Sequence, residues 1–249
     1  MFSLLLLFGA GFLAGCLNAV AGGGTFLTFP TLVYLGVPPV AANATATLAA
    51  LPGYLGSAYG FRHDVSAEGT LGMRGVLTSS ALGSVVGAAL LLVTPSNVFS
   101  GIVPWLLLAA TLLFAFGPNL LRGLRARGVG PAGPATSAAA LFAVSVYGGY
   151  FNGGLGFLLL ATFGLLGYVN LNGMNGLKTL IAALLSMISA VTFALAGLIA
   201  WKAAAIMAVA TLLGGYAGAS LARRVARTDL LRWGIVAVGA GMTIIFFSR

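Results

Sequence analysis

The chain carries one pattern twice: a glycine-rich interruption of an apolar stretch, then a short apolar segment, then a longer segment that opens with Asn and Thr. The equivalent residues keep a constant offset, 154 − 22 = 132, and they are Gly22 and Gly154, Gly24 and Gly156, Asn43 and Asn175, and Thr47 and Thr179. A duplicated, broken hydrophobic segment is the best pointer that a sequence gives to the substrate site of a membrane transporter. The repeat therefore constrains both the fold and the function.

The composition places this repeat in a membrane. Hydrophobic residues make up 60% of the 249 residues, charged residues make up 6%, and the mean hydropathy is +1.08. A soluble domain carries roughly 25% charged residues, and a chain of this size cannot hide so much apolar surface from water. We therefore expect an all-α integral membrane protein, a polytopic helical bundle whose backbone hydrogen bonds are satisfied inside its helices.

Apolar segments divide the chain evenly, about five to each half. They cover 2–20, 25–36, 40–60, 70–93, 102–121, 138–151, 157–168, 173–198, 202–222 and 230–247. A helix needs roughly 20 residues to cross a bilayer, so the segments 25–36, 138–151 and 157–168 are too short to cross comfortably. Each half fits either five crossings or three full crossings plus a re-entrant helical pair.

The net charge of +9 comes from residues between the apolar segments rather than from one basic face. These residues are Arg62, Arg74, Arg122, Arg125, Arg127, Arg223, Arg224, Arg227 and Arg232. This distribution is typical of cytoplasmic loops and argues against a nucleic-acid partner. Placing these loops inside turns the second half upside down relative to the first, which predicts two inverted repeats with both termini outside. Lys202 falls in a loop predicted to be external, and it is the exception.

The predicted organisation has three parts: a first membrane repeat over 1–121, a basic, Gly/Pro-rich cytoplasmic linker over 122–137, and an inverted second repeat over 138–249. The linker is the one long segment without hydrophobic periodicity.

The two glycine clusters predict helix breaks. Backbone groups exposed at a break are tolerated in a membrane only where protein buries them or where they line a wet cavity. The helix that restarts at Thr25 directs its first N–H groups into that space, which suits an anion, and Thr25 is a candidate cap. The second break is predicted over 153–156. The alternative is that these glycines only allow close helix packing.

Polar residues follow each break. Asn43 and Thr47 share a helix face, as do Asn175 and Thr179, while hydrogen bonding between helices is the alternative role for these pairs. Lys178 is the charged residue that lies inside an apolar helix frame, so it is a candidate for substrate contact, or else it snorkels to the surface. The predicted substrate-binding residues are Asn18, Gly22, Gly23, Gly24, Thr25, Asn43, Thr47, Asn152, Gly153, Gly154, Gly156, Asn175, Lys178 and Thr179.

The positions of the few acidic residues argue against proton-relay, metal-binding and enzymatic functions. Asp64, Glu68 and Asp229 fall in predicted loops, as does His63, so a carboxylate relay for coupling, a metal site, a cofactor and an enzymatic function are not expected. Cys16 is interpreted as a packing residue. A role as an accessory subunit of a larger membrane complex is the alternative to transport.

Several motifs resemble the sulfite exporter TauE/SafE family of bacterial membrane permeases. They are Ala21 to Thr25, Phe29-Pro30, Gly36 to Pro39, Tyr147 to Gly156, Asn175 to Lys178, and Gly214 to Gly218. Leu155 and Thr162 depart from the first copy of the repeat, which has Gly23 and Pro30. The resemblance implies a permease of the inner membrane for sulfite, an organosulfonate or a related organic anion. It leaves open the exact substrate, the direction, the coupling ion and the oligomeric state, a homo-oligomer included.

Overall fold

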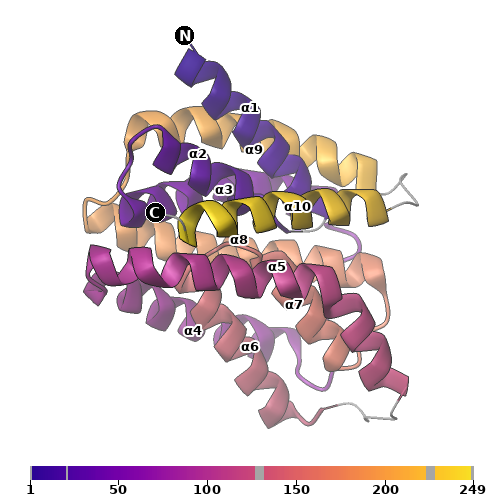
Figure 1. The fold of residues 1–249 in the computed structure, drawn as a ribbon. Helices are drawn as coiled ribbons and strands as arrows, with labels where there is room; N and C mark the ends of the chain where they lie inside the picture. The colour runs from indigo at the N-terminus through magenta and orange to yellow at the C-terminus, as the bar shows by residue number, and fades with distance from the viewer. Residues whose placement is uncertain (1, 21, 127–131, 223–227, 248–249) are drawn as a thin grey trace.

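The computed structural model describes residues 2–20, 22–126, 132–222 and 228–247, and α-helices joined by loops and turns make up this part of the chain (Figure 1). The first half contains α1 (Phe2–Val20), α2 (Thr25–Tyr34), α3 (Pro39–Gly60), α4 (Met73–Val93) and α5 (Ser96–Ala126). The second half contains α6 (Pro134–Tyr150), α7 (Leu155–Leu165), α8 (Leu171–Leu195), α9 (Trp201–Ala222) and α10 (Thr228–Phe247). Each predicted apolar segment is therefore a helix.

Several boundaries differ from the prediction. Helix α6 begins at Pro134, inside the predicted linker 122–137, because proline is well suited to the first turn of a helix. Helix α5 begins at Ser96 and continues to Ala126, because polar residues at a helix start and basic residues at its end extend a helix beyond its apolar part. Helix α7 ends at Leu165, since Gly167 takes a left-handed φ of 92° that terminates the helix. Asp229 lies in the first turn of α10 rather than in a loop.

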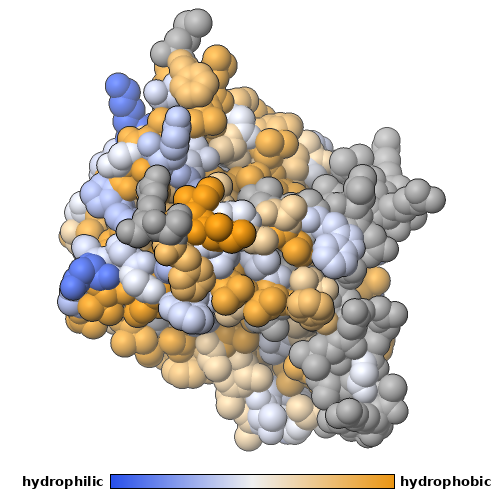
Figure 2. Space-filling view, viewed as in Figure 1, coloured by the Kyte–Doolittle hydropathy of each residue, from blue (hydrophilic) through white to orange (hydrophobic). Residues whose placement is uncertain are grey.

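Four helices among the described residues are long and apolar enough to cross a membrane: α1, α4, α8 and α9. Helices α2 and α7 have 10 and 11 residues, which is too short for a crossing. Hydrophobic residues cover much of the molecular face drawn in Figure 2. Several large apolar side chains of the bundle are more than 60% exposed, among them Leu5, Leu82 and Ile244. Apolar exposure on this scale fits a surface in contact with lipid.

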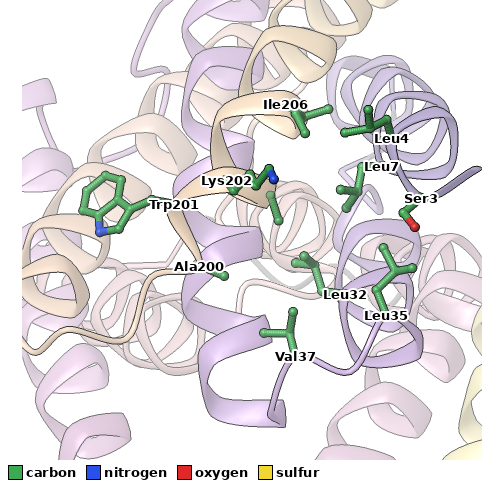
Figure 3. A pocket seen from close by; sticks show the side chains of 11 residues that line it. Ser3, Leu4, Leu7, Leu32, Leu35, Val37, Ala200, Trp201, Lys202 and Ile206 are labelled. Atoms are coloured by element: carbon green, nitrogen blue, oxygen red, sulfur yellow. The ribbon is translucent and has the colours of Figure 1, made fainter. Parts of the chain in front are cut away.

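Helices α1 and α2 form a hairpin. Ser3 and Leu4 from the start of α1 line one cavity together with Leu35 and Val37 from the end of α2, as Figure 3 shows. The chain therefore runs along α1, turns at the first glycine cluster and returns along α2.

Helices α6 and α7 form a second hairpin with its open end at the other side of the bundle. The Thr70 hydroxyl donates to the carbonyl oxygen of Ala132, just before α6, at 2.7 Å. A Cβ at Gly69 would lie 2.6 Å from the ring of Tyr168, just after α7. The start of α6 and the end of α7 thus meet the same loop, 61–72.

The bundle has two ends, which we name after one residue each. The Lys202 end contains the start of α1, the end of α2 and the start of α9. The Glu68 end contains loop 61–72 and the α7–α8 turn, because the Glu68 carboxylate accepts hydrogen bonds of 3.2 Å from the backbone N–H groups of Val169 and Asn170.

Small residues let the main helices approach closely. A Cβ at Gly15 or Gly53 would collide with the backbone of Thr211, so α1 and α3 both lie directly against α9. Gly87 lies against the backbone of Val146 in the same way, which pairs α4 with α6. Close backbone contact through glycine is the usual basis of helix association in lipid, where apolar burial between helices contributes little.

Candidate functional site

The two helix breaks touch each other inside the bundle. The first lies between Val20 and Thr25, and the second lies between Tyr150 and Leu155. A Cβ added to Gly22 would overlap the Cα of Gly156, and the reverse is also true. The Thr25 hydroxyl donates to the Asn152 carbonyl oxygen at 3.5 Å. The breaks therefore run side by side in opposite directions, and we call residues 22–25 and 152–156 the break crossing.

Glycine is required at equivalent points of the two breaks. Gly22 has φ 87° and Gly154 has φ 74°, in the left-handed region that other L-residues enter only with strain. These are the residues that the offset of 132 makes equivalent. The second break comes two residues earlier than predicted, because the chain reverses at Gly154 and the Leu155 N–H bonds back to the Asn152 carbonyl oxygen, so Leu155 and Gly156 are helical.

Lys178 reaches the first break from α8. Its Nζ donates to the Ala19 carbonyl oxygen at 3.2 Å and to Asn175 Oδ1 at 2.9 Å, and its side chain is 0% exposed. The snorkelling alternative is therefore wrong. Ala19 lies in the last turn of α1, where free carbonyl groups give the helix end a partial negative charge that attracts a cation. An ammonium has three N–H donors, so one donor of Lys178 remains after these two bonds.

Asn18 organises the first break from within α1. Its Oδ1 accepts the N–H of Gly24 at 2.7 Å, which ties the restart of the chain to the helix that has just ended. Its Nδ2 is buried and has no hydrogen-bond partner. A buried amide without a partner is unfavourable, so this donor marks a place where a ligand would be stabilised.

Asn152 organises the second break. Its Oδ1 accepts from the Tyr54 hydroxyl at 3.2 Å, and its Nδ2 donates to the Ser186 hydroxyl at 2.9 Å. The Tyr147 hydroxyl donates to the Gly153 carbonyl oxygen at 2.5 Å. The sequence analysis assigned no role to Tyr54, Tyr147 or Ser186, because an isolated Tyr or Ser in an apolar helix has the pattern of a core residue.

Asn43 contacts the end of α6. Its Nδ2 donates to the Tyr150 carbonyl oxygen at 2.9 Å, while its buried Oδ1 has no partner. The hydrogen bond from Lys178 to Ala19 is arranged in the same way. In both, a side chain on a long helix of one half donates to a carbonyl oxygen in the last turn before the break of the other half.

The threonines that follow the first break bond in different ways. Thr25 does not cap α2, because the N-cap residue is Gly24 and the Thr25 hydroxyl points to the second break. Thr45 accepts the N–H of Ala200, in the α8–α9 turn, at 3.0 Å. Thr179 donates within α8, to the carbonyl oxygens of Asn175 and Gly176. Thr47 is buried in α3.

The break crossing is closed in this conformation. Asn18, Asn43, Asn152 and Lys178 are each at most 1% exposed, and the glycines of both breaks are buried. Asn175, which is partly exposed, is the exception among the predicted site residues. A ligand can reach the buried donors only if the hairpins move.

The histidine and the carboxylates whose side chains the structure describes lie away from the crossing. His63, Asp64 and Glu68 are in loop 61–72, as predicted. Within the described residues, no group of three His, Cys, Asp or Glu side chains is placed to hold a metal ion. The chemistry available at the crossing is therefore hydrogen bonding and one positive charge.

Comparison with known proteins gives a consistent result. The family described as sulfite exporter TauE/SafE matches residues 7–246. A probable membrane transporter protein, ORF9, of Sinorhizobium is 33% identical over 227 residues, which cover 88% of this chain and 83% of the relative. A probable membrane transporter protein of Haemophilus influenzae is 30% identical over 96% of this chain and 92% of its own length. The probable membrane transporter protein YfcA of Escherichia coli K12 is 31% identical over 96% and 87%. No solved structure matches.

Proposed function

Because this chain belongs to the sulfite exporter TauE/SafE family of membrane transporters, we propose that it carries a small anion through the break crossing. The protein is a multi-pass membrane transporter and not an enzyme. The proposed cargo is sulfite, an organosulfonate or a related sulfur-containing or organic anion. The proposed location is the bacterial inner membrane, with linker 122–137 in the cytoplasm and both termini outside.

The buried charge of Lys178 carries the proposal of an anion. Both hydrogen-bond partners of this side chain are neutral groups, a carbonyl oxygen and an amide oxygen. A buried ammonium that no anion neutralises is unfavourable, so the site gains most from a ligand of negative charge. The remaining N–H of Lys178 and the free Nδ2 of Asn18 supply the donors for it. The N-terminal turns of α2 and α7 add partial positive charge near the crossing.

The packing of the helices supports two inverted repeats with boundaries at 1–121 and 138–249. Helix α1 packs on α9, and its equivalent α6 packs on α4, which is the equivalent of α9. In the same way α2 contacts α10, while α7 contacts α5. Helices α3 and α8 pack against each other, as equivalent elements do around a pseudo-two-fold axis. The two hairpins open toward opposite ends of the bundle, which an inverted repeat requires.

The proposed mechanism is alternating access around this crossing. Each hairpin carries one break and opens toward one end of the bundle, so the movement of one hairpin would expose the crossing to one side of the membrane. The closed conformation described here is the state between the two openings. Asn18, the glycines, Thr25 and Lys178 would contact the anion. The residues that would hold the breaks in place are Asn43, Thr47, Asn152, Asn175 and Thr179.

The test combines binding and flux. A ligand that binds the folded state raises the melting temperature by mass action, so purified protein is screened against sulfite, sulfate, thiosulfate, sulfonates and carboxylates. An anion that stabilises the protein is then followed in proteoliposomes loaded with it. Saturable flux that Lys178→Met reduces supports the proposal. A protein that neither binds nor moves any of these anions, and that copurifies with a fixed partner, would be an accessory subunit instead.

A further inference from the structure

A cavity of about 620 Å³ opens at the Lys202 end, between the start of α1, the end of α2 and the start of α9 (Figure 3). Its volume lies within the roughly 300–1,000 Å³ of sites that hold small molecules. None of the residues that line it belongs to the break crossing, so this cavity is separate from the proposed anion site. The residues that line it are Ser3, Leu4, Leu7, Leu32, Leu35, Val37, Ala200, Trp201, Lys202, Ala203 and Ile206.

Most of the residues that line this cavity are aliphatic. Leu7 and Leu32 are buried at its base, and Leu4 is 48% exposed at its side. Water gains few hydrogen bonds against such walls, whereas a hydrocarbon chain is stabilised there. Since this chain belongs to a family of membrane transporters, an acyl chain is the occupant that such a lining favours.

One cation lies at the mouth of the cavity. The Lys202 side chain projects toward the aliphatic side chains in Figure 3, and it has no hydrogen-bond or ion-pair partner among the described residues. Trp201 extends from the other side of the same helix and is 62% exposed, as expected of a residue at the lipid headgroup level. The first N–H groups of α9 lie at this level as well.

The predicted membrane orientation places cations at the other end of the bundle and does not account for a lysine at position 202. The other exposed cations whose side chains the structure describes, Arg62 and Arg74, lie at the opposite end, in or next to loop 61–72. Lys202 is also the exception to the arginine pattern that orients the chain. A solitary ammonium above an aliphatic cavity is complementary to a molecule with a negative headgroup and a hydrocarbon tail.

From this juxtaposition we propose that the cavity is a binding site for an anionic phospholipid, with the phosphate against Lys202 and an acyl chain between Leu4, Leu32 and Ile206. The lipid would fill the wedge between the α1–α2 hairpin and α9. It would thereby stabilise the hairpin against the helix that packs on it.

Thermal unfolding of the purified protein with added phosphatidylglycerol or phosphatidylcholine tests this site. Phosphatidylglycerol is expected to raise the melting temperature more than phosphatidylcholine does, and salt is expected to reduce the difference. Lys202→Ala should abolish the difference, whereas Arg62→Ala, which removes an exposed cation at the opposite end, should retain it. Both residues are exposed, so neither change is expected to prevent folding.

A second variant tests the aliphatic part. Ala203→Phe fills the cavity while keeping Lys202, so it should also abolish the preference for phosphatidylglycerol. Equal stabilisation by the two lipids, or a full preference in Lys202→Ala, would overturn the proposal. Stabilisation by glycerol phosphate alone, equal to that by the lipid, would show a site for free anions and would overturn it too.

Discussion

The two halves of the molecule secure the ends of their broken helices with different side chains. Helix α8 uses Lys178, whose ammonium binds the Ala19 carbonyl oxygen at the end of α1. Helix α3 uses Asn43, whose neutral amide binds the Tyr150 carbonyl oxygen at the end of α6. Both side chains donate to a helix C-terminus, but only the first contact brings a charge into the core. The residue of α3 equivalent to Lys178 is Ala46, which is fully buried and carries no charge.

This difference shows how a repeat can be symmetric in backbone and asymmetric in chemistry. The crossing needs two left-handed glycines and close contact, and both halves supply them. The charge is needed once, because two ammonium groups in one closed site would repel each other and double the cost of desolvation. The first break therefore receives the buried lysine, and the second break is held by a neutral network around Asn152.

The largest expected effect concerns the contact between the breaks. Gly22→Ala would combine left-handed strain with a collision against Gly156, for a loss of roughly 2–5 kcal/mol in the free energy of unfolding. Gly156→Ala retains a helical φ and should lose only the part due to the collision. Gly36→Ala is the matched control for strain, because Gly36 has φ 88° with nothing within 4 Å of an added Cβ. Melting temperatures in detergent measure all three.

Comparison of Gly22→Ala with Gly36→Ala separates backbone strain from the collision between the breaks. If both variants lowered the melting temperature equally, backbone strain alone would explain the loss in Gly22→Ala. The stability of the two breaks would then not depend on their mutual contact, contrary to the geometry of the crossing.

The next effect concerns the charged contact. Lys178→Met keeps most of the side-chain volume but removes the charge and both hydrogen bonds. Because a hydrogen bond to a charged group contributes roughly 1.5–3 kcal/mol, anion flux in proteoliposomes should fall by about 10- to 100-fold. Arg62→Ala is the control, since it removes a cation outside the crossing. Unchanged flux in well-folded Lys178→Met would show that this ammonium has a purely structural role.

Loss of the neutral contact between Asn43 and the Tyr150 carbonyl oxygen should affect anion flux less than loss of the Lys178 contact. Asn43→Ala removes one hydrogen bond and leaves the Tyr150 carbonyl oxygen buried without its partner, which costs about 1–3 kcal/mol of stability. The substrate contacts are intact, so the concentration of anion at half-maximal flux should stay near that of the wild type. A large rise in that concentration, with little change in melting temperature, would show that Asn43 contacts the anion rather than only supporting the second break.

The sequence predicted the backbone of this site better than its side-chain contacts. Glycine spacing located both breaks, because the left-handed turns at Gly22 and Gly154 admit no other residue without strain. Apolar length located the helices, since lipid imposes a simple rule on segment length. The second break was placed two residues late, because Leu155 looks like part of a Gly-rich loop but packs in the core.

Contacts between distant segments could not be predicted in the same way. Thr45 and Thr179 have similar settings in the sequence, yet one bonds the α8–α9 turn and the other bonds its own helix. The partners of a hydroxyl depend on which helix packs beside it, and that is a property of the tertiary fold. Tyr54 was missed for the same reason, since the tertiary fold brings the hydroxyl of this α3 residue to Asn152 in the second break.

The smallest expected effect separates the two threonines that the repeat makes equivalent. Thr179→Val removes a hydroxyl whose proton is used within α8, so the helix loses little, and the melting temperature should change by no more than the equivalent of about 1 kcal/mol. Anion flux should be unchanged within twofold, because this hydroxyl donates to its own helix rather than to the crossing. Thr47→Val in α3 is the matched variant from the other half. A severalfold loss of flux in Thr47→Val alone would show that the first half contributes a hydroxyl to the anion. Helix α3 would then take part in anion binding as well as in supporting the second break.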